Sequence, residues 1–251
     1  HNLLMLAPRR IGKTVLLNHL SRTAADNGFR AILLDLEGFR EERDFFRACC
    51  SGIQEELSTG TKVMTAFTNR LGQLLRGSAS GSGDWRQWLV QTDWQEFADH
   101  LFAHLDDHEE DPPWLILIDE LPVFVQALQE KGGAEATGRF LYWLRGMRQK
   151  HRRIRWLYAG SIGLDTVARR NRVEGALNDL EAFTLKPFGE DTARAFLADI
   201  AARRRCSLAI DAADAILQRL GWLSPYYLER IAEDACALAG VPPFAGFFSK
   251  D

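Results

Sequence analysis

The first part of the chain alternates short apolar runs with longer amphipathic segments. Runs of β-strand length occur at Leu3–Leu6, Arg30–Leu36, Trp114–Ile118 and Ile154–Ala159, and Phe183–Leu185 is predicted as a fifth strand. The run Trp114–Ile118 carries no charge, and a strand that is apolar on both faces belongs inside a parallel sheet covered by helices. Repeated strand–helix–strand units of this kind predict a three-layer α/β fold.

Amphipathic segments between these runs are predicted as helices. They span about Lys13–Asn27, Trp94–Leu105 and Thr137–Gln149. Gly28 supplies a C-terminal stop for the first helix, and the Thr137 hydroxyl is a candidate N-cap for the third. The run of Gly, Ser and Ala at 77–83 predicts a flexible loop.

The pattern changes near Lys186–Pro187, and only helical segments follow. Ser224–Pro225 is a typical helix start, with a capping hydroxyl followed by proline at the first helical position. We therefore expect an α/β domain over residues 1–186 and a small helical domain over 187–251. The helices of this second domain are expected at about Asp191–Arg204, Asp211–Leu220 and Ser224–Leu238.

Composition narrows the class of protein. The 251 residues are 46% hydrophobic, and 34 acidic against 31 basic residues give a formal charge of −3. This balance argues against coating nucleic acid by bulk charge, although a local basic patch remains compatible with it. No apolar run approaches the roughly 20 residues of a membrane span. The four cysteines form no C-x-x-C pair, which predicts free thiols in a reducing, cytoplasmic setting.

A phosphate-binding motif lies between the first predicted strand and the first predicted helix. The segment Ala7-Pro-Arg-Arg-Ile-Gly-Lys-Thr14 fits the Walker A pattern, with alanine in place of the first glycine. Backbone N–H groups and the helix dipole favour an anion there, and Gly12 permits close approach. Lys13 would reach the β- and γ-phosphates, and the Thr14 hydroxyl would ligate Mg²⁺. The expected nucleotide contacts are Pro8, Arg9, Arg10, Ile11, Gly12, Lys13, Thr14 and Val15.

Two acids follow the most apolar strand. Asp119 and Glu120 end the run Leu115–Ile118 and would stand at the carboxyl edge of the sheet, where ligands of open α/β sheets bind. Asp119 is expected to hold Mg²⁺, and Glu120 to activate the attacking water as a general base. Ser161 follows the next strand along the chain. It is either a simple turn residue or, if its strand lies beside that of Asp119, a polar group near the γ-phosphate.

Taken together, these motifs resemble the prokaryotic AAA+ ATPases of the archaeal-ATPase type, relatives of the origin-recognition and STAND groups. The resemblance rests on the Walker A segment with its Arg-Arg, on Ile118-Asp-Glu120, on Gly160-Ser161, on Leu185-Lys-Pro-Phe188 and on the run from Gly221 to Leu228. It implies a P-loop NTPase fold with a parallel five-stranded sheet in the order 5-1-4-3-2 and a helical lid after Pro187.

The resemblance also implies residue roles. Ser161 takes the sensor 1 position, which adds it to Lys13 and Glu120 as a catalytic residue, and Pro225 packs near the nucleotide. Two departures are visible: Pro225-Tyr-Tyr227 stands where a sensor 2 arginine is usual, with Arg230 one turn later, and few residues precede the first strand to hold adenine. Because the family often continues into a winged-helix domain, we expect this chain to be part of a longer polypeptide.

The sequence contains three arginine clusters whose binding partner it does not identify. They follow the Ser161 loop (Arg169, Arg170, Arg172), crowd the end of a helix and the next strand (between Arg145 and Arg155), and end a lid helix (Arg203–Arg205). Each cluster is a solvated face, a contact to DNA phosphates, or a source of an arginine finger for a neighbouring copy. Arg169, Arg170 and Arg172 are the finger candidates.

The sequence therefore predicts an ATPase that uses ATP and Mg²⁺. Its expected role is a conformational switch or motor for an attached effector or nucleic-acid-binding domain. The alternative is a nucleotide-dependent assembly module that binds ATP with little hydrolysis. A small-molecule kinase fits less well because Glu120 beside Asp119 suits activation of water. No N-K-x-D guanine motif and no LSGGQ-like signature occurs in the sequence.

Overall fold

The computed structural model describes residues 1–58, 93–107, 110–160, 163–206 and 208–239. The loop expected at 77–83 lies outside these residues. The chain forms two compact units: a core unit of His1–Leu6 with Thr14–Phe183, and a lid unit of Ala7–Lys13 with Thr184–Asp251. The phosphate-loop segment is thus grouped with the C-terminal helices. The division into domains 1–186 and 187–251 stays a prediction.

The core unit contains one five-stranded sheet in the order β2-β3-β4-β1-β5. The strands are β1 (Leu3–Leu6), β2 (Arg30–Asp35), β3 (Trp114–Asp119), β4 (Ile154–Gly160) and β5 (Glu181–Thr184). The pairs β1–β4, β2–β3 and β3–β4 are parallel. This order, read from the other edge, is the predicted 5-1-4-3-2, and it is confirmed.

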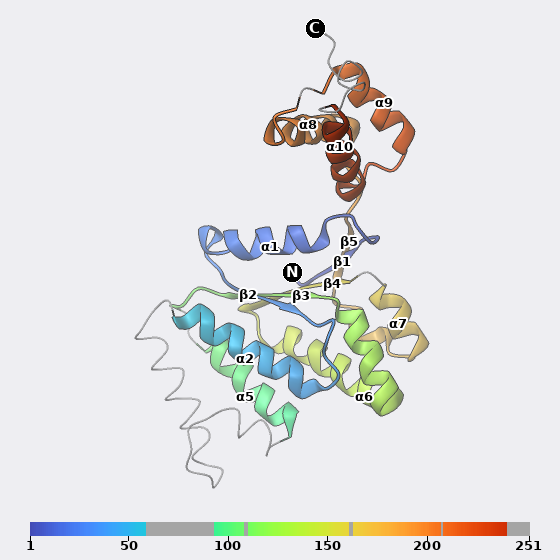
Figure 1. Cartoon of the computed structure of the whole chain (residues 1–251). Coiled ribbons are helices and arrows are strands. Elements are labelled where there is room, and N and C mark those ends of the chain that lie inside the picture. Colours follow the sequence, from blue (N-terminus) through green and yellow to red (C-terminus); the bar gives the residue numbers. More distant parts are fainter. Residues whose placement is uncertain (59–92, 108–109, 161–162, 207, 240–251) are drawn as a thin grey trace. The chain divides into compact units, whose positions relative to one another are not determined.

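Helices cover both faces of this sheet. Helix α1 lies on one face and α2, α5 and α6 lie on the other (Figure 1). These helices span Lys13–Thr23, Glu42–Ser58, Trp94–Asp106 and Leu121–Lys150. The short α7 (Leu164–Arg170) and the 3₁₀ turns η1 (Ala25–Asn27) and η2 (Glu174–Leu177) complete the core unit. The predicted three layers are therefore present.

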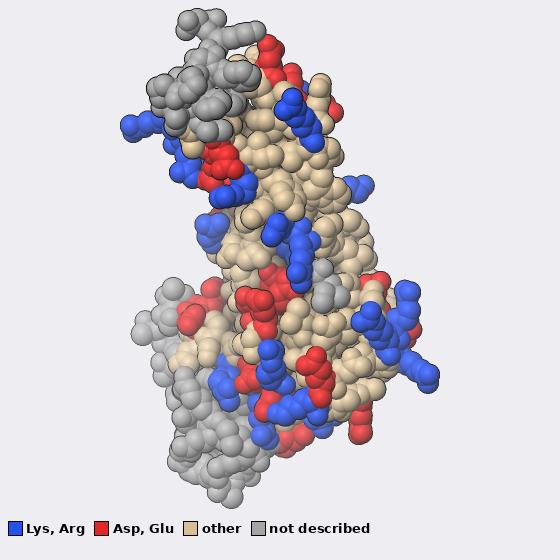
Figure 2. Space-filling view, turned by 45° about the vertical axis from the view of Figure 1, so that its right-hand side comes forward, with Lys and Arg blue, Asp and Glu red and all other residues tan. Residues whose placement is uncertain are grey.

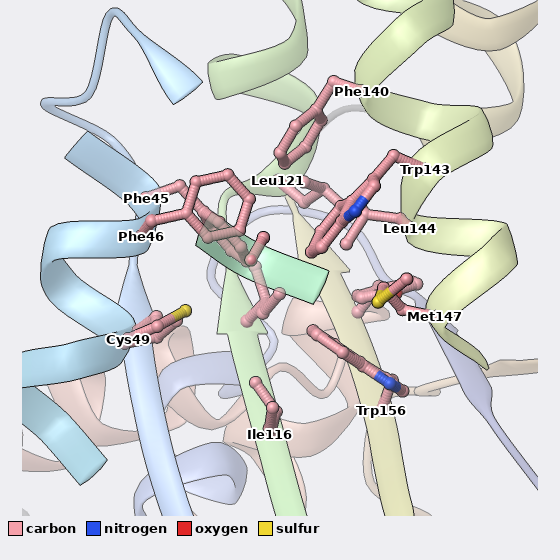
Figure 3. Close-up of a cluster of buried hydrophobic side chains, with 14 of the residues drawn as sticks. Phe45, Phe46, Cys49, Ile116, Leu121, Phe140, Trp143, Leu144, Met147 and Trp156 are labelled. Carbon is pink, nitrogen blue, oxygen red and sulfur yellow. The ribbon is translucent and has the colours of Figure 1, made fainter. Parts of the chain in front are cut away.

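Aromatic side chains fill the space between the sheet and α2, α5 and α6. Phe140 of α6 lies 5.4 Å from Phe45 and 5.2 Å from Phe124, both edge-to-face, and Trp143 lies 5.0 Å from Phe46 between ring centroids. Figure 3 shows the rings of Phe45, Phe46, Phe140 and Trp143 gathered over Ile116 of β3 and Trp156 of β4. Edge-to-face pairs stabilise a core beyond their buried area. This packing fixes the position of β3, which carries Asp119 at its end.

The structure corrects some predicted element boundaries. Strand β5 begins at Glu181, two residues before the predicted Phe183. Helix α6 already begins at Leu121 and is interrupted at Gly133, whose φ of 69° is outside the helical range. Thr137 is therefore inside a helix and not its N-cap, and its hydroxyl donates to the Gly133 carbonyl oxygen at 3.2 Å. A hydroxyl that bonds back to residue i−4 is a common alternative to capping.

The lid unit contains three helices among its described residues. They are α8 (Glu190–Arg203), α9 (Ile210–Leu220) and α10 (Pro225–Ala239), and they pack around a small apolar core of their own. Helix α10 begins at Pro225, as the Ser224–Pro225 pair predicts. Within the described residues, no helix has the length and apolar character needed to span a membrane.

We expect Phe140→Ala to destabilise the core unit by about 3–5 kcal/mol, because it removes a fully buried ring from the aromatic cluster. Tyr142→Ala is the matched control, since Tyr142 lies on the same helix and its side chain is 48% exposed. Urea unfolding followed by tryptophan fluorescence measures both. Equal losses in the two variants would contradict the assigned core.

Candidate nucleotide-binding site

The phosphate loop connects the end of β1 to the first residue of α1. Gly12 has φ of 92°, in the left-handed region that favours glycine. A Cβ added at Gly12 would meet only the Cγ atom of Pro225, at 3.9 Å, which is an ordinary contact. The backbone conformation, and not a lack of space, is therefore what requires glycine here. Arg10 also has a positive φ, of 64°.

Lys13 is held within the loop itself. Its side chain is buried, at 7% relative exposure, and Nζ donates to the Pro8 carbonyl oxygen at 3.3 Å. An ammonium group has three donors, so one long hydrogen bond leaves capacity for further acceptors. A phosphate bound by the loop could occupy those donors.

Thr14 and Asp119 form the most direct link in the candidate site. The Thr14 hydroxyl donates to Asp119 Oδ2 at 2.7 Å, and Asp119 is only 5% exposed. The other carboxylate oxygen, Oδ1, accepts from the backbone N–H of Glu120 at 2.9 Å. These two bonds place a hydroxyl and a carboxylate, which were predicted as metal ligands from separate motifs, side by side.

Glu120 occupies the turn between β3 and α6. Its φ of 54° is unusual for a residue other than glycine, and such strain often occurs at functional sites. Its carbonyl oxygen accepts from the N–H groups of Val123 and Phe124, the first turn of α6. The backbone of Glu120 is thus fixed by the strand on one side and by the helix on the other.

The side-chain oxygens of Thr14 and Asp119 are suitable ligands for Mg²⁺. No group of three or more His, Cys, Asp or Glu side chains able to hold a metal occurs within the described ranges. Mg²⁺ does not require a site made entirely of protein ligands, because it is usually bound through one or two protein oxygens, waters and substrate phosphates. The adjacent hydroxyl and carboxylate supply protein oxygens of that kind.

Asp35 is a neighbour that the sequence analysis missed. It ends β2 and is the register partner of Asp119 on β3, so both acids stand at the same edge of the sheet. Side chains of register partners in parallel strands point to the same face. The available signal was the one used for Asp119, an acid directly after an apolar strand. Asp35 is exposed, and its Oδ1 accepts from the Glu37 N–H at 3.1 Å.

The lid unit adds residues that the motif did not include. Pro225 faces Gly12, and its place near the nucleotide stays a prediction. Ser224, Tyr226 and Tyr227 contact Arg10 through two hydrogen bonds and two cation–π contacts. Their proximity to the loop depends on how the lid helices pack, which no local sequence pattern encodes.

The remaining predicted contacts are placed less specifically. Ile11 is buried, whereas Val15 on α1 is 71% exposed. Pro8 and Arg9 are exposed, and no side-chain hydrogen bond or ion pair joins Arg9 to another described residue. Ser161 lies outside the described residues, although Gly160 before it ends β4, between β1 and β3.

Three of the arginines around residue 150 form hydrogen bonds within the core unit. Arg148 is buried and forms a two-pronged contact with Asp179 at 2.7 and 2.8 Å, and it reaches the Tyr158 hydroxyl at 3.1 Å. Burial lowers the pKa of Arg148, but the contacts with Tyr158 and Asp179 outweigh it and raise the net pKa. Arg145 and Arg153 bond to the carbonyl oxygens of Gly175 and Asp111. This cluster is therefore not one free basic face.

Other arginines are available at the surface. Arg169, Arg170 and Arg172 are exposed at or just after the end of α7, and no ion pair joins them to the part of the chain that the structure describes. On the face of the molecule in Figure 2, basic and acidic side chains are interspersed and form no continuous basic expanse.

Comparisons with known proteins support the fold. No family model matches the sequence, and no curated protein is similar to it by sequence. The structure resembles the Walker-type ATPase of Pyrococcus abyssi, with a TM-score of 0.57 and 18% identity over 90% of this chain and 60% of that one. It also resembles Cdc6p of Pyrobaculum aerophilum, with a TM-score of 0.50 and 17% identity over 95% of this chain and 54% of that one.

This chain therefore spans little more than half the length of either protein. The TM-scores of 0.57 and 0.50 indicate a common fold, whereas identities below 20% leave the activity of this chain open. The resemblance inferred from the motifs is confirmed at the level of the fold: the chain has the predicted three-layer P-loop fold, which it shares with these two proteins.

Proposed function

We propose that this chain binds ATP with Mg²⁺ and hydrolyses it. The observation that carries the proposal is the Thr14–Asp119 hydrogen bond of 2.7 Å. It joins the first turn of the helix after the phosphate loop to the acidic end of β3, and this is the pairing that a Mg-nucleotide site needs. The fold shared with a protein named as a Walker-type ATPase supports the nucleotide class.

The loop and the two metal ligands have separate tasks. Backbone N–H groups of the loop and the Lys13 ammonium would bind the phosphates, and Thr14 and Asp119 would hold the metal. Magnesium, when bound, neutralises charge on the β- and γ-phosphates. Pro8, Arg9, Arg10, Ile11, Gly12 and Val15 complete the proposed contacts along the loop, and Pro225 faces them at Gly12.

Glu120 is the proposed general base. It would accept a proton from a water whose oxygen attacks the γ-phosphorus, while the bond to the bridging oxygen breaks and ADP leaves with the electron pair. Its fixed backbone supports this role, because a positioned base must keep its orientation through the reaction. Ser161 is proposed to sense the γ-phosphate.

The cycle would serve as a switch. Residues 1–186 would act as the ATPase core and residues 187–251 as a lid whose movement reaches an attached effector or nucleic-acid-binding domain, in the cytoplasm. DNA would be contacted only by exposed basic residues or by a further C-terminal domain, since Arg148 already pairs with Asp179 inside the core unit. Assembly of several copies is the second candidate, and the exposed arginines of α7 favour it.

Glu120→Gln should lower phosphate release from MgATP by about 10²–10⁴-fold, because the amide cannot take up the proton. Affinity for MgATP should change by less than about threefold, since the loop and Thr14–Asp119 remain. Glu130→Gln, at an exposed position of α6, is the control. Turnover of Glu120→Gln equal to that of the control would refute the assigned base.

If one copy supplies an arginine finger to the ATP site of another copy, wild-type turnover per chain should rise with protein concentration. Arg169→Ala, Arg170→Ala and Arg172→Ala should be tested singly, and the variant that removes the finger should lose about 10³-fold in rate with ATP binding retained. Arg152→Ala, which removes an exposed arginine elsewhere in the core unit, is the control.

Light scattering on the same samples separates the two candidate functions. Turnover that is independent of concentration and of all three arginines would rule out the shared site. ATP-dependent assembly without turnover at any concentration would instead identify the assembly module.

A further inference from the structure

The N-terminus of α10 contacts the phosphate loop at several points. We call residues Ser224–Tyr227 the lid strap. Ser224 has no exposed surface, and its hydroxyl donates to the carbonyl oxygen of Arg10 in the loop. Both segments belong to the lid unit. A buried hydroxyl aimed at a loop carbonyl is a specific contact, because a buried polar group without a partner is costly.

This hydrogen bond sets the direction of one peptide unit in the loop. In a planar trans peptide, the C=O of one residue and the N–H of the next point in opposite directions. When Ser224 holds the Arg10 carbonyl, the N–H of Ile11 must point away from the strap. Ile11 lies in the part of the Walker A segment whose N–H groups cradle phosphate. The positive φ of Arg10 shows that its backbone conformation needs such support.

The side chain of Arg10 makes a second connection to the strap. Its guanidinium carbon lies 4.6 Å from the ring centroid of Tyr226 and 5.9 Å from that of Tyr227. Nη1 donates to the Tyr227 hydroxyl at 3.5 Å, and this hydrogen bond raises the pKa of Arg10, as do the charges of the two tyrosines. The two rings pack edge-to-face at 5.4 Å.

The tyrosines themselves are only partly covered. Tyr226 is 41% exposed and Tyr227 is 38% exposed, so the rings that Arg10 contacts are not buried in an apolar core. Pro225, between Ser224 and the rings, contacts the position of Gly12. All members of the strap therefore face the same short segment, Arg10–Gly12.

We propose that the lid strap is a positioning element for the phosphate loop. Ser224 holds the Arg10–Ile11 peptide with its N–H toward the phosphates, and the Arg10–Tyr226 contact ties the same residue to α10. Phosphate binding and the position of α10 are then coupled, and the coupling is reciprocal. This inference rests on the proposed ATP site and names the residues through which the lid would respond to it.

Ser224→Ala tests the hydroxyl alone. Without nucleotide, the backbone amides of residues 9–13 should exchange hydrogen about tenfold faster, because the Arg10 carbonyl loses its partner. The dissociation constants for MgATP and MgADP should rise by a similar factor. Ser224→Thr keeps the hydroxyl and should restore both values to within about threefold. Thr192→Ala, which removes an exposed hydroxyl from α8 of the lid unit, is the control.

Tyr226→Leu tests the ring separately. It should raise the dissociation constant for MgATP about two- to fivefold, the usual range for an exposed cation–π contact. Trp222→Leu removes a neighbouring exposed aromatic residue and should leave the constant unchanged. Far-ultraviolet circular dichroism confirms that the lid helices remain folded in each variant.

Unchanged loop exchange and unchanged affinity in a folded Ser224→Ala variant would overturn the inference. Failure of the proposed function looks different: wild-type protein would bind no MgATP, while faster loop exchange in Ser224→Ala would still support the structural coupling. Faster exchange in Thr192→Ala equal to that in Ser224→Ala would show a general loosening of the lid unit and would also overturn the inference.

Discussion

The contact between the Thr14 hydroxyl and the Asp119 carboxylate is the constraint on which the candidate site depends. It binds the start of α1 to the end of β3 at 2.7 Å, and each partner comes from a different motif. Since Thr14 directly follows Lys13 in the chain, the same contact anchors one end of the phosphate loop. Asp119 can keep this position because β3 packs against the aromatic cluster that includes Phe140 and Trp143.

Three residues of the two motifs have a backbone conformation that is unusual for most residues. Arg10, Gly12 and Glu120 all have positive φ, and each stands in the phosphate loop or directly after β3. A residue such as Glu120 in this conformation costs about 1–3 kcal/mol, so neighbouring bonds must hold it in place. Asp119 and the first turn of α6 hold Glu120, and Ser224 holds Arg10. The first group of bonds lies in the core unit, and the second lies in the lid unit.

Much of this arrangement could be predicted from the sequence, because its determinants are local. The charge-free run before Asp119 indicates a buried strand, and the glycine and lysine before Thr14 indicate a phosphate loop. The sheet order followed from the resemblance to a family and not from periodicity. Strand β5 was placed two residues late because its first residues, Glu181 and Ala182, are exposed and show no apolar pattern.

Other features depend on tertiary contacts and escaped prediction. Arg148 looked like part of a basic surface, yet its burial and its pairing with Asp179 are decided by the packing of α6 against the chain around η2. Thr137 has the residue type of an N-cap, but the helix break lies at Gly133 instead. The contact between Ser224 and Arg10 joins residues more than 200 positions apart, so no sequence window contains it.

The central claim is that Thr14 and Asp119 form a metal-dependent nucleotide site, and ATP affinity with and without Mg²⁺ tests it most directly. Asp119→Asn keeps an oxygen that can accept from Thr14 but removes the negative charge. In the wild-type protein, Mg²⁺ should tighten ATP binding about tenfold or more, equal to about 1.4 kcal/mol per factor of ten, and Asp119→Asn should lose this gain. An Asp119→Asn variant that binds ATP with the full effect of Mg²⁺ would contradict the account.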